Sequence, residues 1–329
     1  MFATDLAEGL SDLGVLNTVV ALAPGVADDS LDIDVLGPSR RSRTTVSNLR
    51  RLAPDHDVVV AHGSSTLVVS ALALTGTKVP FVYRQISDPE FWAATWPRRV
   101  RVAALIRRAR VIVALSHGSS AVLRSHYRLD GSRISVIPNA VPERSSADED
   151  RRDDSGPVEL LYLGALAAEK GVDFAVRAAA AVDEARLTVA GAGPERSALE
   201  ALASDLAPDR ITFIGSVDDP RSLLASSDLL LLPSRGGDSM PAVLIEAGLQ
   251  GLACVTTPVG SITDIVLDGE TGRVVPVGDQ SGFSRDVADL VAEPGVRSRL
   301  GAAARDHCTE HFTIGIVAPK WLDVLRSVL

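Results

Sequence analysis

Two carboxylates eight residues apart mark the segment of this chain that is richest in potential chemistry. The apolar run Leu229–Leu232 leads into a glycine-containing loop, and Pro241 then takes a position suited to the first turn of a helix. Backbone N–H groups at a helix start, together with the helix dipole, favour phosphate binding. Asp238 in the loop and Glu246 about one turn inside the helix can face the same region, where a carboxylate can accept two hydrogen bonds from a ribose diol. Spacing alone leaves open the alternative of a solvated loop acid and a helix-surface glutamate.

These residues need a sheet to position them, and the hydropathy pattern predicts one. Short apolar, β-branched runs alternate with segments of helical period along almost the whole chain. The runs are continuous in hydrophobicity, which indicates strands buried on both faces in parallel sheets covered by helices. The sequence therefore predicts an α/β fold of doubly wound sheets. The predicted strands cover residues 15–22, 31–36, 57–61, 79–83, 111–115, 134–137, 158–163, 186–190, 210–214, 228–232 and 252–256.

A charged segment divides the strand and helix pattern into two halves. Residues 143–157 (ERSSADEDRRDDSGP) lack apolar periodicity and are dense in charge, so we expect an exposed linker there. The linker separates residues 1–142 from residues 158–312, and a chain of 329 residues (34.6 kDa) is long enough for two cores. In a pair of such sheets, the ligand usually lies in the cleft at the carboxyl ends of the strands.

Composition and charge exclude several classes of protein. A hydrophobic fraction of 46% and a charged fraction of 23% exclude a disordered or collagenous chain. The net charge of −9 argues against general nucleic-acid binding, which needs a basic face. Residues 1–142, however, hold 16 Lys and Arg against 12 Asp and Glu, an excess that favours an anionic surface or substrate. We expect a cytoplasmic protein on three grounds. The chain has two cysteines, too few for a disulfide scaffold, and the sequence shows neither a secretory signal nor an apolar run of about 18 residues.

Several segments in a fixed order resemble one enzyme family. The span from Asp238 to Glu246, within PSRGGDSMPAVLIEAGLQG, resembles the E-x7-E motif of retaining glycosyltransferases of family 4. The resemblance covers nearly all of residues 111–312, with a weaker match near the start, and the chain is identified as a member on that basis. The other matching segments are residues 136–141, 163–171, 189–196, 211–217, 255–260 and 268–276.

This resemblance implies a GT-B architecture, in which two Rossmann-like domains face each other across a cleft. Residues 1–142 would form the acceptor domain, joined by a closing helix over 313–329, and residues 158–312 would hold the nucleotide sugar. Glu246 would bind the ribose hydroxyls, Asp238 the donor sugar, and Lys170 the diphosphate. The remaining residues implied at the donor site are Gly164, Gly215, Val217, Ser239, Met240, Pro241 and Ala242.

The resemblance also implies a reaction. Family members keep the anomeric configuration, and the leaving phosphate is usually proposed to take the acceptor's proton. A lysine and a helix terminus replace a divalent cation, so no metal and no cofactor are expected beyond the nucleoside-diphosphate sugar, which is a substrate. The expected acceptor is a glycan, a lipid-linked molecule or a small molecule, in envelope or exopolysaccharide synthesis. The sequence does not identify the nucleobase and the sugar of the donor, or the acceptor.

Three departures from the family pattern affect the donor site. The first glutamate of the motif is Asp238 here, one methylene shorter. The arginine expected after Gly164 is Ala165, which leaves Lys170 without its usual partner unless Arg235 or Arg84 compensates. Arg84, with Asp88 near it, also stands where many members place a histidine, and we predict a catalytic role for it, a surface arginine being the alternative.

The first half of the chain raises further alternatives. Residues 4–14 and 15–22 match the family's first helix and second strand, so the first strand is missing unless the true start lies upstream or another element fills its place. His62, at a strand end, is expected to touch the acceptor or to form a plain turn. The basic segment 97–110 is expected to be a packed helix, with peripheral membrane contact as the alternative. A non-catalytic nucleotide-sugar-binding subunit remains the alternative to an enzyme.

Overall fold

The computed structural model describes residues 2–25, 33–86, 95–143 and 156–329, so most of the predicted linker and Asp88 lie outside the described residues. The chain divides into two compact units. Unit 1 comprises Met1–Pro142 and Ile314–Leu329, and unit 2 comprises Glu143–Thr313. In the described parts of the chain, no helix combines the length and the apolar character needed to cross a membrane.

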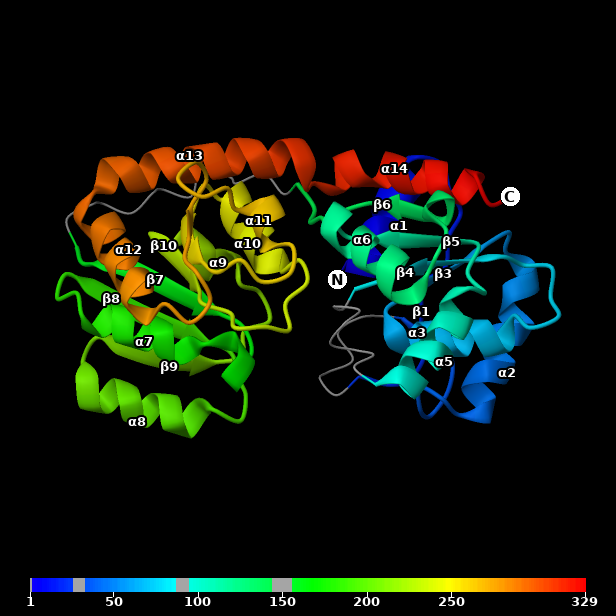
Figure 1. Ribbon diagram of the computed structural model, residues 1–329, viewed down its shortest axis with the longest axis horizontal. Helices are drawn as coiled ribbons and strands as arrows, with labels where there is room; N and C mark the ends of the chain where they lie inside the picture. The colour runs from blue at the N-terminus through cyan, green and yellow to red at the C-terminus, as the bar shows by residue number, and fades with distance from the viewer. Residues whose placement is uncertain (1, 26–32, 87–94, 144–155) are drawn as a thin grey trace. The chain divides into compact units, whose positions relative to one another are not determined.

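A four-stranded parallel sheet forms the centre of unit 1, with the strand order β3-β4-β5-β6 (Figure 1). Alternate residues of β4 enter two different cores, Phe81 and Tyr83 on one face and Val82 on the other. Burial on both faces is what the continuous apolar runs predict. The strands are β3 (Val59–His62), β4 (Phe81–Arg84), β5 (Val111–Ala114) and β6 (Ile134–Val136).

Helices cover both faces of this sheet. The first face packs against α3 (Ser64–Ala73), α5 (Trp96–Ile106) and α6 (His117–Tyr127). The other face packs against α1 (Phe2–Asp12) and α14 (Ile314–Arg326), which lie beside each other and bury Trp321 completely. The C-terminal helix therefore belongs to the same core as the N-terminal helix.

The start of unit 1 differs from the predicted strands. The helix predicted over residues 4–14 is found as α1, but the strand predicted over 15–22 shrinks to β1 (Val20–Ala21). It pairs only with β2 (Asp34–Val35), in a separate two-stranded sheet beside α2 (Arg43–Leu52) and α3. The difference has a physical reason, because the side chains of β2 are exposed and no second apolar face is buried there.

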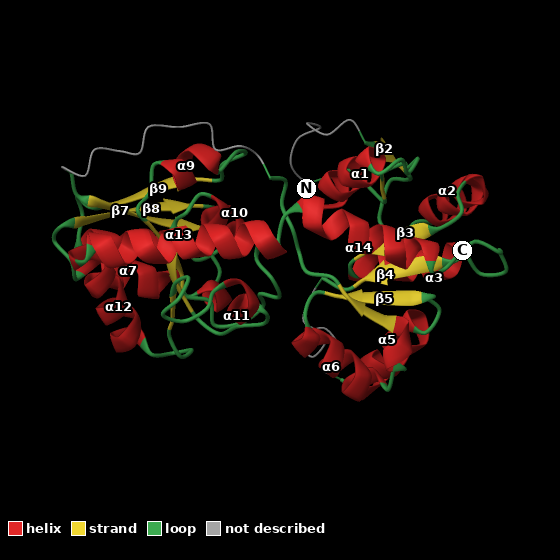
Figure 2. Cartoon of the chain, turned by 90° about the horizontal axis from the view of Figure 1, so that it is seen from above, coloured by secondary structure: helices red, strands yellow, loops and turns green. Residues whose placement is uncertain are grey.

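Unit 2 is built on a six-stranded parallel sheet with the order β12-β11-β10-β7-β8-β9. Figure 1 labels β7 to β10 of this sheet, and Figure 2 shows β7, β8 and β9 from above. The chain first builds outward from β7 to β8 and β9, and then returns to the other side of β7 with β10. The order therefore reverses between β7 and β10, and ligands of doubly wound sheets bind at such a switch point. The strands are β7 (Val158–Leu163), β8 (Ala185–Ala190), β9 (Ile211–Gly215), β10 (Leu229–Leu232), β11 (Ala253–Thr256) and β12 (Arg273–Val274).

The helices of unit 2 form two layers around that sheet. On one side α7 (Val172–Ala180) contacts α8 (Arg196–Leu206) and α12 (Gln280–Ala292). On the other side α10 (Ala242–Leu249) packs along α13 (Pro294–His311). Two short helices, α9 (Arg221–Ala225) and α11 (Ile262–Ile265), complete the connections. The architecture is the predicted α/β fold with doubly wound sheets.

Candidate functional site

The loops that follow β7 and β10 bring together two of the residues predicted from the motifs. Leu229 and Leu230 of β10 pair directly with β7, so the loops after the two strands leave the sheet side by side. The loop after β7 leads through the short 3-10 helix η3 (Ala168–Lys170), and the loop after β10 carries Asp238. Nζ of Lys170 lies 2.5 Å from Oδ1 of Asp238, in an ion pair whose side chains are 19% and 12% exposed.

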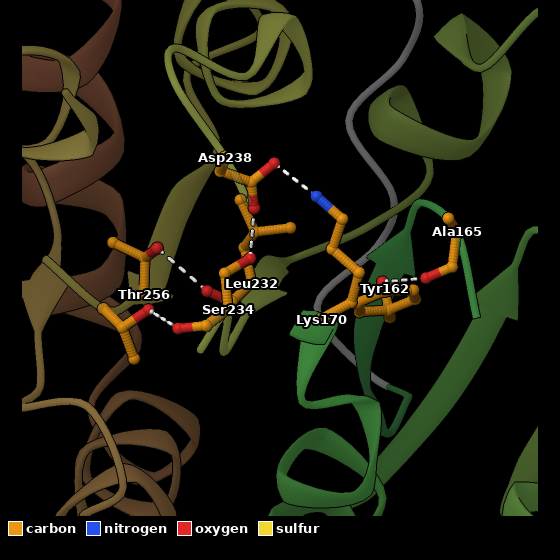
Figure 3. Close-up of polar contacts among 8 residues, drawn as sticks. Tyr162, Ala165, Lys170, Leu232, Ser234, Asp238 and Thr256 are labelled. Atoms are coloured by element: carbon orange, nitrogen blue, oxygen red, sulfur yellow. Dashed lines mark hydrogen bonds and ion pairs between the residues drawn. The ribbon is translucent and has the colours of Figure 1, made fainter. Parts of the chain in front are cut away.

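Ser234 fixes the other oxygen of the same carboxylate (Figure 3). The Ser234 hydroxyl donates to Oδ2 of Asp238, and the residue is fully buried. Its own backbone is held in turn, because Oγ1 of Thr257 donates to the Ser234 carbonyl oxygen at 2.5 Å. The Asp238 carboxylate is therefore held from two sides, by a cation and by a neutral donor. The motif comparison missed Ser234, although its place directly after the buried strand was visible in the sequence.

Two glycines let the loops approach this closely. Gly171 adopts a φ of +65°, and a Cβ atom there would lie 2.1 Å from the carbonyl oxygen of Pro233. Gly260 adopts a φ of +59°, and a Cβ atom there would lie 2.2 Å from the carbonyl oxygen of Asp238. Both positions combine a left-handed backbone with close backbone contact, so only glycine fits them. The loop holding Asp238 is thus packed against its neighbours on two sides.

Helix α10 begins beside this pair. The sequence predicts Pro241 as the first helical residue, and this is wrong by one position. Its ψ of 126° is extended, so Pro241 is the residue before the helix and α10 begins at Ala242. No side chain caps this helix start, which leaves its first N–H groups in the arrangement that favours phosphate. Glu246 lies in the second turn, half-buried, while the side chain of Met240 is buried and offers only its backbone to a ligand.

The glycine loop after β7 is shaped by a buried tyrosine. The Tyr162 hydroxyl donates to the carbonyl oxygen of Ala165 at 2.8 Å. A Cβ atom on Gly164 would lie 3.1 Å from that hydroxyl oxygen. Burial raises the pKa of Tyr162, and the nearby charges of Asp238 and Glu169 add to the effect, so the hydroxyl remains a proton donor. Ala165 is exposed, at the position where the family pattern has an arginine.

Arg235 does not fill the place of the missing arginine. Its guanidinium donates to Oδ2 of Asp173 at 2.7 Å and to the carbonyl oxygen of Ala168 at 3.2 Å. It also lies over the ring of Phe174, 4.6 Å from the ring centroid. Lys170 therefore has Asp238 as its ion-pair partner, and Arg235 is held by a different acid.

Gly215 and Val217 lie at the end of β9, on the outer part of the same sheet. Gly215 adopts a φ of +80°, and its carbonyl oxygen accepts from Gly191 N at 2.7 Å. Val217 follows in the loop and is half-buried. Both residues stand at the carboxyl end of a strand, as do the loops after β7 and β10.

Arg84 and His62 belong to unit 1, at the ends of neighbouring strands. The register of β3 and β4 places His62 opposite Arg84. Arg84 is 3% exposed, donates from Nη2 to Oδ1 of Asn139 at 2.9 Å, and lies over the ring of Phe2 at 3.5 Å from its centroid. It is therefore not a surface arginine. Burial lowers the pKa of Arg84 to about 9, so the guanidinium is still charged at neutral pH.

The basic segment 97–110 packs into unit 1 through the apolar stripe that the sequence suggested. Val102, Ile106 and Ala109 of this stripe are buried in the core. Trp96 and Val100, at the start of α5, are 74% and 49% exposed. The stripe therefore stabilises the fold and is not available to a membrane.

Comparisons with known proteins agree with these motifs. The family model described as "Glycosyl transferases group 1" matches residues 157–293, and the one described as "Glycosyltransferase Family 4" matches residues 1–144. N-acetyl-alpha-D-glucosaminyl L-malate synthase of Bacillus anthracis is 29% identical over 68% of this chain and 61% of its own length. Lipopolysaccharide core biosynthesis glycosyltransferase LpsE of Rhizobium meliloti is 30% identical over 51% of this chain and 49% of its own. The chain thus spans about half to two thirds of these relatives.

Solved structures show the same fold. Sucrose-phosphate synthase from Thermosynechococcus elongatus superposes with a TM-score of 0.82 at 19% identity, over 99% of this chain and 92% of that one. Anabaena HepE in complex with UDP superposes with a TM-score of 0.78 at 19% identity, over 86% of this chain and 82% of that one. The predicted GT-B type of fold, with two Rossmann-like units, is confirmed.

Proposed function

The chain belongs to glycosyltransferase family 4, the group 1 glycosyl transferases, and we propose that it transfers a sugar from a nucleoside-diphosphate donor to an acceptor hydroxyl. The observation that carries this proposal is the Lys170–Asp238 ion pair at the switch point of unit 2, beside an uncapped helix start. A lysine and free N–H groups at one place provide the positive charge that a diphosphate needs.

Donor binding would exchange partners within this pair. The diphosphate carries more negative charge than a carboxylate and competes with Asp238 for Lys170. When Lys170 turns to the phosphates, Asp238 remains held by Ser234 and is free to accept a hydrogen bond from a sugar hydroxyl. Glu246 would bind the ribose. The backbone positions proposed to line the diphosphate and the base are Gly164, Gly215, Val217, Ser239, Met240, Pro241 and Ala242.

The proposed chemistry is a front-face transfer with retention. The bond between the anomeric carbon and the diphosphate oxygen breaks, the acceptor oxygen bonds to the same face of that carbon, and the leaving phosphate takes the acceptor's proton. Lys170 and the start of α10 would stabilise the charge that develops on the leaving group. No metal and no cofactor take part in this scheme.

The acceptor is proposed to be a glycan, a lipid-linked molecule or a small molecule in cell-envelope or exopolysaccharide synthesis, on the cytoplasmic side. Relatives with this fold carry names as different as a glucosaminyl malate synthase and a glycogen synthase, so the acceptor varies among them. A peripheral membrane contact would have to use the exposed Trp96, Val100 and neighbouring arginines of α5, because the apolar stripe is buried.

The second candidate is a nucleotide-sugar-binding subunit without catalysis. Ala165 favours it, because Lys170 lacks the arginine that would share the diphosphate charge, and Arg235 is engaged by Asp173. Calorimetric titration of UDP, GDP and dTDP tests the donor site. We expect one nucleotide to bind and Glu246→Ala to abolish that binding. Turnover of the matching nucleotide sugar then separates an enzyme from a binding subunit.

A further inference from the structure

Unit 1 buries a positive charge that no acid in the described structure neutralises. Arg84 is 3% exposed, and its guanidinium contacts the amide oxygen of Asn139 and the face of the Phe2 ring. Its Nε atom has no hydrogen-bond partner among the described residues. A buried charge is costly unless it is paired, so a guanidinium kept in this state indicates an anionic partner that is not among the described residues.

Two more nitrogens of the same cluster also lack partners. Nδ1 of His62 and Nε1 of Trp321 are buried and unpaired among the described residues. The His62 ring lies 6.1 Å, centroid to centroid, from the Trp321 ring and 6.1 Å from the Phe2 ring, and its strand neighbour is Arg84. Three unpaired nitrogens around one aromatic cluster have no oxygen to bind. Nε of Arg84 and Nε1 of Trp321 can only donate, so a ligand that satisfies them is an acceptor of hydrogen bonds, and Nδ1 of His62 joins them in the tautomer that carries its proton there.

Arg84 supplies the charged side chain of the site. Burial, together with the positive charge of Arg84, lowers the pKa of His62 to about 3, so its imidazole is neutral at ordinary pH. A neutral imidazole beside a guanidinium can donate one N–H without adding a second charge. Carboxylate and phosphate groups fit a guanidinium with a neutral N–H donor beside it. Each of these anions offers two oxygens that a guanidinium can bind at once.

Phe2 controls the way into the cluster. It is half-buried, begins α1, and its ring covers the guanidinium. His62 and Gly63 also retain exposed surface, whereas Trp321 is fully buried behind them. An anion therefore reaches Arg84 when the ring of Phe2 swings away, a movement that the first residue of a helix can make without disturbing the rest of it.

We infer that Arg84 and His62 form an anion-binding site in unit 1 that takes a carboxylate or phosphate group of the acceptor, with Phe2 as its cover. The role of the anion as part of an acceptor rests on the proposed function. The site itself rests on the burial and the unpaired nitrogens of this cluster.

The test is calorimetric titration of the whole chain with inorganic phosphate and, separately, with succinate. We expect saturable binding of at least one of them, which also distinguishes a phosphate from a carboxylate ligand. Arg84→Gln should weaken it about tenfold or more, because a charge-assisted hydrogen bond is lost. Phe2→Ala should tighten it, because the cover is gone, and Arg84→Lys should retain part of it. Arg110→Gln removes an exposed arginine of the same unit and should have no effect.

Two results would overturn the inference: binding that is unchanged in Arg84→Gln, or no saturable binding even in Phe2→Ala. The Phe2→Ala result does not depend on whether Arg84→Gln folds. UDP, GDP and dTDP titrated in parallel report on unit 2 through the binding that Glu246→Ala abolishes. If a nucleotide binds but Arg84→Gln leaves the affinity for the anion unchanged, only this inference fails. If anion binding follows Arg84 but no nucleotide binds, the site stands and the proposed function fails.

Discussion

Lys170 and Asp238 are separated by 68 residues of sequence, yet Nζ of the first lies 2.5 Å from a carboxylate oxygen of the second. The contact joins the loops after β7 and β10 at the point where the strand order of unit 2 reverses. Under the proposed function, in which the donor binds both residues, each therefore occupies the place where the donor would bind the other. Substitutions of the two should therefore have opposite effects on nucleotide affinity.

Asp238→Asn should tighten the binding of the nucleoside diphosphate roughly fivefold, because an ion pair of this exposure is worth about 1 kcal/mol and no longer competes for Lys170. Lys170→Met should weaken binding by at least as much. Asp238→Asn should nevertheless slow sugar transfer, because the amide is a poorer acceptor for a sugar hydroxyl. Calorimetry and a transfer assay measure the two effects. Asp183→Asn, an exposed acid elsewhere in unit 2, serves as the control. Weaker binding in Asp238→Asn would contradict the partner exchange.

Ser234→Ala should lower the rate of transfer while leaving nucleotide affinity nearly unchanged, because it frees one oxygen of Asp238 but leaves Lys170 and α10 in place. Loss of this buried hydrogen bond should also cost about 1–3 kcal/mol of unfolding free energy. Ser227→Ala, which removes a part-buried hydroxyl bonded to Leu223 in the same unit, controls for stability alone. Equal transfer rates in the two variants would rule out a positioning role for Ser234.

Gly260→Ala should both destabilise unit 2 and disturb Asp238. The left-handed backbone alone costs about 1–2 kcal/mol for alanine, and the new Cβ atom would press on the Asp238 carbonyl oxygen. Gly278 provides the matched control, because its φ is +89° but nothing lies within 4 Å of a Cβ atom there. Chemical denaturation and a transfer assay on both variants separate strain from collision. We expect activity to fall further in Gly260→Ala than in Gly278→Ala.

The sequence predicts the elements that carry these residues better than the contacts between them. The strands over 158–163 and 229–232 were predictable from continuous apolar runs, and Lys170 and Asp238 lie in the loops that follow them. The ion pair between them was not predictable, because the hydropathy pattern determines neither the side-chain rotamers nor the path of the loops. The same limit applies to Arg235, whose acid partner lies on α7.

Local patterns fail most where a contact depends on tertiary packing. Arg84 was open to interpretation as a surface residue, because nothing near it in sequence shows that Phe2 of α1 covers it. The strand over 15–22 was predicted too long for a related reason. An apolar run forms a long strand only when a neighbouring strand pairs with it along its length. Strand β1 pairs with β2, which has two residues, both exposed.

The final prediction concerns acid. His62 has a pKa of about 3 in the folded chain against 6.5 as a free side chain, mainly because it is buried. Between these values the unfolded chain binds a proton that the folded chain does not, so the free energy of unfolding rises with pH across this window. Acidification from pH 6.5 to 4.5 should therefore destabilise unit 1 by up to about 1.4 kcal/mol per pH unit through His62.

Urea denaturation at a series of pH values measures this slope. His62→Phe, which keeps a ring between Phe2 and Trp321, should reduce it, because phenylalanine has no proton to gain. His117→Phe, at the exposed start of α6, replaces a histidine outside the cluster and serves as the control. The same slope in His62→Phe and in the parent would show that His62 is accessible to protons in the folded state, and the buried cluster around Arg84 would then have to be open to water.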